Sequence, residues 1–213
     1  LRPGGLNAAH TEYLHRYFRE EIFPIITPQA VDPDGPFPSL LTRALHLCVR
    51  LKNPPGAPRK PRVAVIQIGP HMDRFITLPG GDDYAFILLE DVVRMFLDDC
   101  FPGECILESC VFRLTQNADM AADDRASDLM EAMEAVLDAR KDSACVRLEI
   151  EATATKGLQT YFKRALSIKD RAVYRIRGPL DLAAFMNRGG VSGYEELKNP
   201  SWPPQPVPAM DPD

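Results

Sequence analysis

Alternation of hydrophobic and polar residues predicts several β-strands. Residues 42–52 place an apolar side chain at every second position, as strands do: Leu45, Leu47, Val49 and Leu51. Residues 146–150 alternate strictly, which predicts a strand with one buried face. Residues 62–68 are almost entirely apolar and β-branched, a pattern typical of a strand buried on both faces.

Shorter apolar runs predict the rest of a sheet. Residues 74–78 and 84–88 flank a glycine-rich segment around Gly80 and Gly81, which predicts a hairpin. Residues 106–115 and 172–177 are also expected to be strands.

Apolar residues at helical spacing predict the helices. The first helix is expected over residues 9–23, where Leu14, Phe18 and Ile22 share one face and Pro24 stops the helix. Further helices are expected around 89–96, over 127–140, over 158–166 behind the N-cap Thr155, and over 179–186. A turn is expected over the acidic residues 118–126.

Strands and helices that alternate without strict βαβ units, with a hairpin among them, predict the fold class. We expect an α+β two-layer sandwich with a mixed, mostly antiparallel sheet and helices packed on one face. One domain is expected over residues 1–202, followed by a proline-rich linker over 203–213 that leads to further domains.

Composition and charge limit the possible partners and the compartment. The net charge of −5 argues against a nucleic-acid partner. No apolar run approaches the ~18 residues that a membrane helix needs, so no membrane span is expected. The five cysteines are an odd number without a Cys-x-x-Cys pair, which favours a cytoplasmic protein with free thiols and predicts no metal site.

The most distinctive segment follows the first helix. Residues 17–38 carry Pro24, Pro28, Pro33, Pro36 and Pro38, so on physical grounds they form a stiff connector from a helix to a sheet. This segment resembles the start of the middle, or head, domain of bacterial polyphosphate kinase, where an aromatic helix leads into an Asp-x-x-x-Pro-Phe-Pro stretch.

The resemblance continues along the chain in the expected order. Arg74-Phe75-Ile76-Thr77-Leu78-Pro79 resembles the family's Arg-Phe-x-x-Leu-Pro strand, and Leu89-Glu90-Asp91 resembles its Leu-Glu-Asp helix start. Phe112-Arg113-Leu114-Thr115-Gln116-Asn117-Ala118-Asp119 is similar to the family's Phe-Arg-x-Thr-Arg-x-Ala-Asp segment, with Gln116 where the family usually has arginine. The similar region runs from about Tyr13 to Trp202.

The resemblance implies a module of a larger enzyme. That enzyme transfers the ATP γ-phosphate reversibly to inorganic polyphosphate through a phosphohistidine, with ATP and magnesium held by other domains. The head domain would support assembly and the phosphate tunnel, with other domains of the same polypeptide and a second copy as partners. No catalytic residue carries over, so the isolated chain is expected to be inactive. The alternative is an unrelated intracellular α+β interaction or ligand-binding module.

Four arginines are the candidate polyphosphate contacts, because several of them lie on predicted strands and a guanidinium suits phosphate oxygens: Arg74, Arg113, Arg175 and Arg177. The competing interpretation is that the strand arginines pair with acids such as Glu108 and Glu149. The four histidines show no metal-ligand spacing and no nearby nucleophile, so they are expected to be structural.

Overall fold

The computed structural model describes residues 1–56, 60–69, 71–80, 84–117, 144–200 and 202–203. The chain divides into two compact units, Leu1–Leu180 and Asp181–Asp213. The helix expected over 127–140 and the turn expected over 118–126 lie outside the described residues.

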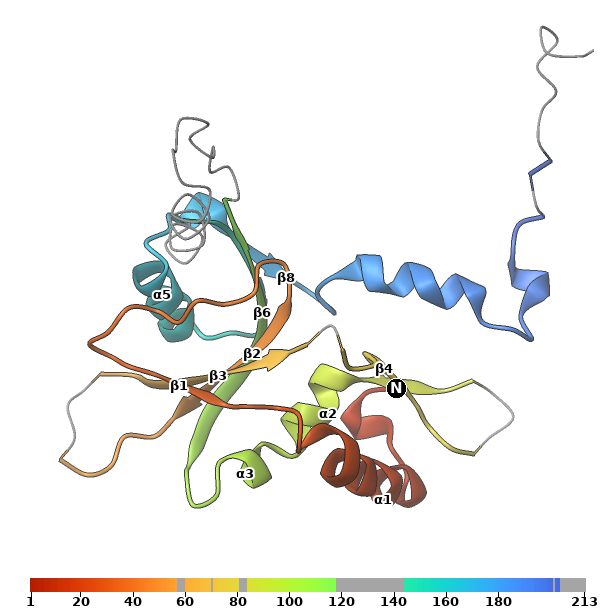
Figure 1. Cartoon of the computed structure of the whole chain (residues 1–213), viewed down its shortest axis with the longest axis horizontal. Coiled ribbons are helices and arrows are strands. Elements are labelled where there is room, and N and C mark those ends of the chain that lie inside the picture. The colour runs from red at the N-terminus through yellow and green to blue at the C-terminus, as the bar shows by residue number, and fades with distance from the viewer. Residues whose placement is uncertain (57–59, 70, 81–83, 118–143, 201, 204–213) are drawn as a thin grey trace, which may run out of the picture. The chain divides into compact units, whose positions relative to one another are not determined.

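A six-stranded sheet organises the first unit, with strand order β1-β3-β2-β6-β7-β8 (Figure 1). The strands are β1 (Gln29–Val31), β2 (Leu45–Leu51), β3 (Arg62–Ile68), β6 (Ile106–Gln116), β7 (Cys145–Glu151) and β8 (Val173–Ile176). Only β7 and β8 run parallel; the other neighbours are antiparallel. The sheet is therefore mixed and mostly antiparallel, as predicted.

The first face of the sheet is the one that carries Leu47 and Val111. It is covered by α1 (Ala8–Tyr17), the π-helical η2 (Phe18–Ile22) and α2 (Leu89–Met95), with α3 (Leu97–Cys100) beside them (Figure 1). The predicted first helix is thus α1 continued by η2. Asn7 caps α1, because its side chain accepts a hydrogen bond from the His10 backbone N–H.

The predicted hairpin forms a separate two-stranded sheet from β4 (Phe75–Thr77) and β5 (Phe86–Leu88). Ile76 and Ile87 are opposite each other in its register and join the same apolar core as α1 and α2. The hairpin and the helices therefore cover the first face together.

The second face of the sheet carries its own apolar core, and α5 (Lys156–Ala165) covers it. Leu158 and Phe162 of α5 pack against Cys48, Phe112 and Ile150 of three strands. Thr155 caps α5 as predicted, since its hydroxyl accepts from the Leu158 backbone N–H.

The α+β class is confirmed, but the layering needs a correction. The helices α1, η2 and α2 lie on the first face of the sheet, as expected. Helix α5 lies on the second face and forms a third layer. The physical reason is that the central strands are buried on both faces. Every residue from Val63 to Ile66 is buried, so the side of β3 that faces away from α1 also needs a cover.

Short 3₁₀ segments complete the description: η1 (Pro3–Gly5), η3 (Asp170–Ala172), η4 (Leu182–Gly190) and η5 (Glu195–Leu197). The last two belong to the second unit, where η4 takes the place of the helix expected over 179–186. The domain end expected at residue 202 stays a prediction.

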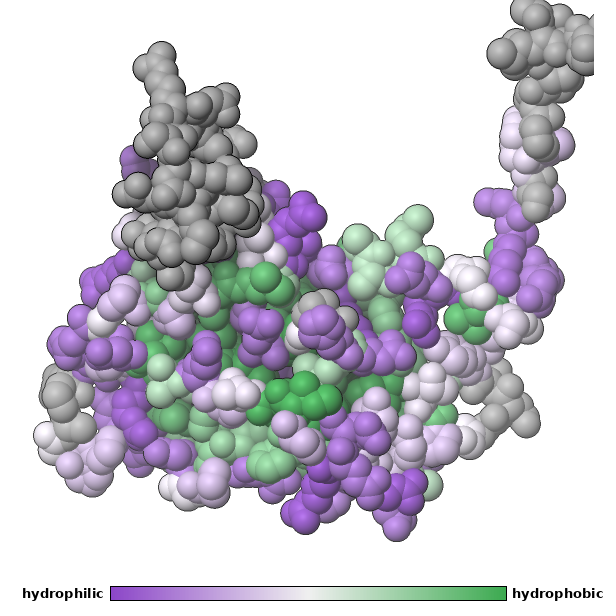
Figure 2. Space-filling view, viewed as in Figure 1, coloured by the Kyte–Doolittle hydropathy of each residue, from purple (hydrophilic) through white to green (hydrophobic). Residues whose placement is uncertain are grey.

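Apolar surface remains exposed on the first unit (Figure 2). The large apolar side chains that keep more than two fifths of their surface accessible there include Phe23, Ile25, Leu41, Leu107, Val146 and Tyr174. Within the described residues, no helix is both long enough and apolar enough to cross a bilayer.

Candidate functional site

Arg74 is committed to an internal ion pair. Its guanidinium donates to the Glu90 carboxylate at 2.5 Å and to the Leu180 carbonyl at 2.7 Å. The two side chains are only 11% and 5% exposed. Arg74 therefore ties the hairpin and α2 to the end of the first unit, and its charge is already neutralised by a buried carboxylate.

Arg113 and Arg147 share one carboxylate on the first face of the sheet. Arg113 stands two positions after the core residue Val111 and opposite Glu149 in the register, so all three side chains point to that face. Arg113 lies 3.5 Å from Glu149, and its Nε donates to the Arg43 carbonyl at 2.8 Å. Arg147 donates to the same carboxylate at 2.7 Å.

Tyr174 adds an aromatic platform to this pair. The Arg147 guanidinium lies 4.0 Å from the centre of its ring, which is cation–π geometry. The Arg147 side chain is 44% exposed, against 21% for Arg113. We call Arg113, Arg147, Glu149 and Tyr174 the arginine cluster. Arg147 is the more accessible of its two guanidinium groups.

Arg175 lies on the opposite face of the sheet. It is paired with Ile150, whose side chain belongs to the second core. Arg177 follows the end of β8, and both arginines are exposed. The structure therefore brings Arg113 together with Arg147, but not with Arg74 or Arg175.

Glu149 and Glu108, the two acids expected as possible partners of the strand arginines, form different ion pairs. Glu149 does pair with Arg113 and Arg147. Glu108 instead pairs with Arg50 and accepts from the Thr155 hydroxyl at the start of α5. The importance of Arg147 was missed, because strand register cannot be read from one sequence.

His10 and His46 are buried, and His15 and His46 pack against aromatic rings. His46 is fully buried and stacks on Phe112 with ring centres 5.3 Å apart. Burial lowers the pKa of His46 to about 4, so the ring is neutral at pH 7. His15 packs edge-on against Phe96. Within the described residues, no three His, Cys, Asp or Glu side chains form a possible metal site.

The proline-rich connector that marks the sequence forms one wall of a pocket. The Asp34 N–H donates to Asp32 Oδ1 at 2.9 Å, which closes a tight turn. A Cβ atom on Gly35 would lie 2.9 Å from Asp32 Oδ2, so the turn accommodates glycine there. The prolines around this turn restrict the backbone further.

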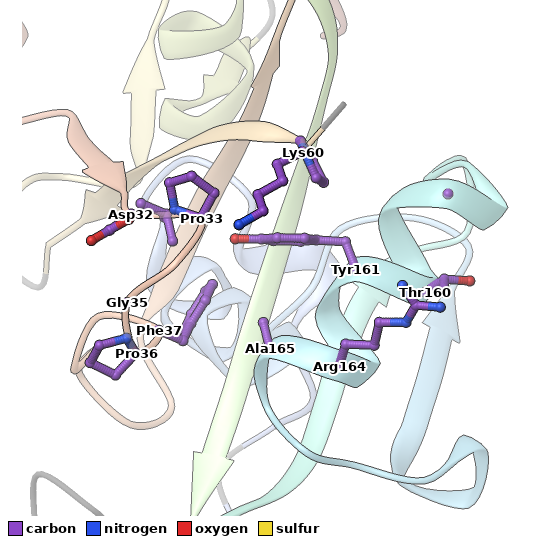
Figure 3. Close-up of a pocket in the computed structure, with 13 residues that line it drawn as sticks. Asp32, Pro33, Gly35, Pro36, Phe37, Lys60, Thr160, Tyr161, Arg164 and Ala165 are labelled. Atoms are coloured by element: carbon purple, nitrogen blue, oxygen red, sulfur yellow. The ribbon is translucent and has the colours of Figure 1, made fainter. Parts of the chain in front are cut away.

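The facing wall of this pocket is one side of α5. Gly157, Thr160, Tyr161 and Arg164 follow each other at spacings of three and one, which places them along one helical stripe. The hollow has a volume of about 480 Å³ (Figure 3). We call it the connector pocket; Val31, Asp32, Pro33, Gly35, Pro36, Phe37, Lys60, Pro61, Gly157, Thr160, Tyr161, Arg164 and Ala165 line it.

The chain matches the model of one known protein family. Residues 9–188 match the model of the polyphosphate kinase middle domain. The chain belongs to this family. The match includes the connector, both faces of the sheet and the arginine cluster, so the resemblance noted from the sequence is confirmed.

Individual relatives agree with the polyphosphate kinase assignment. The chain is 35% identical over 218 residues to a polyphosphate kinase of Exiguobacterium sibiricum, covering 99% of this chain and 30% of that protein. It is 36% identical over 208 residues to a polyphosphate kinase of Bacillus cereus, covering 94% and 30%. The chain thus spans about 30% of the length of these polyphosphate kinases.

A solved polyphosphate kinase shares the fold. The crystal structure of the enzyme from Porphyromonas gingivalis superposes with a TM-score of 0.69 at 21% identity, over 94% of this chain and 28% of that one. The expected alternative of an unrelated module is set aside by the family match. The role of Gln116 stays a prediction; in the structure its backbone N–H donates to the Thr42 hydroxyl at 3.0 Å.

Proposed function

We propose that this chain is the non-catalytic middle domain of an enzyme that transfers the ATP γ-phosphate to inorganic polyphosphate. The match to the polyphosphate kinase middle domain over residues 9–188 is the observation that carries the proposal. In this proposal the phosphohistidine, ATP and magnesium belong to other domains of the same polypeptide. Within the described residues no three His, Cys, Asp or Glu side chains form a possible metal site, and the proposal assigns no chemical step to this chain.

The arginine cluster is the surface that we assign to polyphosphate. Arg147 keeps 44% of its side-chain surface exposed while it pairs with Glu149, so its guanidinium is accessible to an anion. Tyr174 and Glu149 hold Arg147, and the Arg43 carbonyl holds Arg113. Contacts that fix the side chains in advance reduce the entropy lost when a ligand binds. Arg175 and Arg177 are exposed on or beyond the other face and lack this arrangement.

Assembly is the second role in the proposal. Phe23 and Ile25 flank Pro24 at the end of η2, and they are 46% and 60% exposed. Burying such side chains against another domain or a second copy is favourable by about 25 cal/mol per Å² of apolar surface. We also assign the protein to the cytoplasm, where its five cysteines, all unpaired in the structure, would stay reduced.

The test uses the full-length kinase with Arg113 and Arg147 both changed to glutamine. Partly exposed charge contacts contribute ~1 kcal/mol each, so the KM for polyphosphate should rise about fivefold or more. The KM for ATP should not change, because nucleotide is held elsewhere in this proposal. The matched control changes Arg175 and Arg177 to glutamine, which removes the same charge from the other side.

Two results would contradict the proposal. An equal rise in the polyphosphate KM for both double variants would show that net charge, rather than the arginine cluster, is responsible. Phosphorylation of the isolated 213-residue chain by ATP and magnesium would show that this domain carries catalytic groups itself.

A further inference from the structure

The connector pocket has a chemistry that the proposed function does not use. Its lining combines aromatic rings, prolines and two cationic side chains, and its two walls come from segments more than 100 residues apart. A concave, mostly apolar pocket with a few polar groups is typical of a small-molecule site, and about 480 Å³ lies within the usual range of such sites.

Flat aromatic surface lines the middle of the pocket. The Tyr161 ring extends from α5 across the hollow toward Lys60, and Phe37 lies on the connector side (Figure 3). The two rings are 6.5 Å apart and nearly perpendicular. Burial raises the pKa of Tyr161 to about 12, so its hydroxyl stays protonated at neutral pH and can donate a hydrogen bond. An aromatic ligand can stack against such a wall.

Positive charge frames the aromatic surface. Lys60 pairs with Asp34, but the two side chains are 50% and 71% exposed, so this pair exchanges readily with solvent or a ligand. Within the described part of the chain, the Arg164 guanidinium has no hydrogen-bond or ion-pair partner; it lies on α5 beside Thr160 (Figure 3). The Asp32 carboxylate points away from the hollow and accepts from the Asp34 N–H.

We propose that the connector pocket binds a small aromatic phosphate ester, with a nucleoside monophosphate as the ligand class. The base stacks on Tyr161 between the aromatic and proline walls. The phosphate is held by Lys60 and the Tyr161 hydroxyl. The Arg164 guanidinium lies beside Thr160 at the other end of the Tyr161 ring and adds positive charge to that rim (Figure 3). A polyphosphate chain could contact the cations of this pocket but would leave its apolar walls unused. The connector pocket is a different site from the arginine cluster and from the ATP site that the proposed function places in other domains.

The test titrates the 213-residue chain with AMP, adenosine and inorganic phosphate, followed by calorimetry and by NMR shifts of the connector and α5. AMP should bind more tightly than either of its parts. Lys60→Gln should weaken AMP binding about fivefold to tenfold, as expected for a partly exposed charged hydrogen bond. Arg164→Gln should weaken AMP binding less, because its charge lies at the other rim of the pocket. Tyr161→Leu should weaken adenosine binding and should weaken AMP binding more, because it removes both the stacking ring and the hydroxyl that holds the phosphate.

Lys156→Gln is the matched control, because it removes one cation from the same helix outside the pocket lining. Its AMP affinity should equal that of the unchanged chain, and thermal melting verifies that each variant is folded. Three results would overturn the proposal: no binding at millimolar AMP, equal affinity for AMP and inorganic phosphate, or an equal loss in the Lys156 variant. Equal affinity would indicate an adventitious anion site.

Discussion

The Arg74 guanidinium and the Glu90 carboxylate meet at 2.5 Å in the core of the first unit, and the carboxylate side chain is only 5% exposed. Arg74 also donates to the Leu180 carbonyl, so one charged group joins the hairpin, α2 and the last residue of the unit. Arg74, one of the four candidate polyphosphate contacts, therefore has a structural role in the first unit.

We expect Arg74→Ala to destabilise the chain strongly. The change leaves a buried carboxylate without its partner, and breaking a buried ion pair costs about 3–5 kcal/mol. Urea unfolding followed by circular dichroism measures the free energy of unfolding. The control is Arg62→Ala, which breaks the exposed pair with Glu104 and should have a much smaller effect. Similar losses in both variants would contradict the assignment of Arg74 as an internal clamp.

His46 should make the fold sensitive to acid. Its pKa is about 4 in the folded chain because of burial, below the ordinary value of 6.5. The unfolded chain therefore binds a proton first as the pH falls, and stability is lost between pH 6.5 and pH 4. Because protonation is linked to unfolding, His46 alone should lower the free energy of unfolding by about 2 kcal/mol between pH 7 and pH 5.

The variant His46→Leu should remove that part of the pH dependence. The free energy of unfolding is measured at pH 7 and at pH 5 for both chains. The drop between these two pH values should be about 2 kcal/mol smaller in the variant than in the unchanged chain. His71→Leu, at an exposed position, is the control and should leave the difference as it is. An identical pH dependence in all three chains would show that His46 is not the responsible group.

Local patterns in the sequence predicted most of the elements. The strand expected over residues 62–68 is β3 with the same bounds, because a continuous β-branched run has few alternatives to a buried strand. Thr155 was identifiable as a cap from its place before the apolar stripe of α5. The same apolar run in β3 also indicates a third layer, because a strand buried on both faces needs other elements packed against each face.

The candidate site was less predictable, because it depends on contacts between distant segments. Arg113 and Arg147 come together only through the pairing of β6 with β7, and that register is not encoded in local spacing. Lys60 and Arg164 border one pocket although 104 positions separate their numbers in the chain. In the sequence, Arg74 resembles the other three candidate arginines. Only its burial beside Glu90 in the structure distinguishes it from them.

The end of α5 offers a stabilising substitution. Ser167 adopts a left-handed conformation with φ of 53° directly after the helix. The Ile168 N–H donates to the Lys163 carbonyl, and the Ser167 N–H to the Arg164 carbonyl, which is the Schellman pattern. Ser167→Gly should raise the free energy of unfolding by about 0.5–1 kcal/mol, because glycine adopts this conformation without steric cost.

Urea unfolding again measures the effect of the Ser167 change, and Ser167→Val provides the opposite test. A β-branched side chain is strained in the left-handed region, so the valine variant should be less stable than the unchanged chain. A valine variant as stable as the glycine variant would show that the backbone at residue 167 relaxes freely.

Polyphosphate binding by the isolated chain should be weak and should decline as salt rises. The net charge of −5 gives no long-range attraction for a polyanion, so binding depends on local arginines. Exposed charges are screened over ~8 Å at physiological ionic strength, which weakens such contacts. Labelled polyphosphate titrated at low and at physiological salt measures this dependence directly, and tight binding at both would contradict it.

The same titration distinguishes the arginine cluster from the other candidate arginines. Arg113→Lys with Arg147→Lys keeps the charge but loses the planar fork, so low-salt binding should stay below that of the unchanged chain. The glutamine pair at these positions should bind least, whereas Arg175→Gln with Arg177→Gln should retain most of the binding. If the lysine pair binds as well as the unchanged chain, the cluster acts only as a diffuse charge. If the Arg175 and Arg177 variant loses binding instead, the contact surface lies on the α5 side of the sheet.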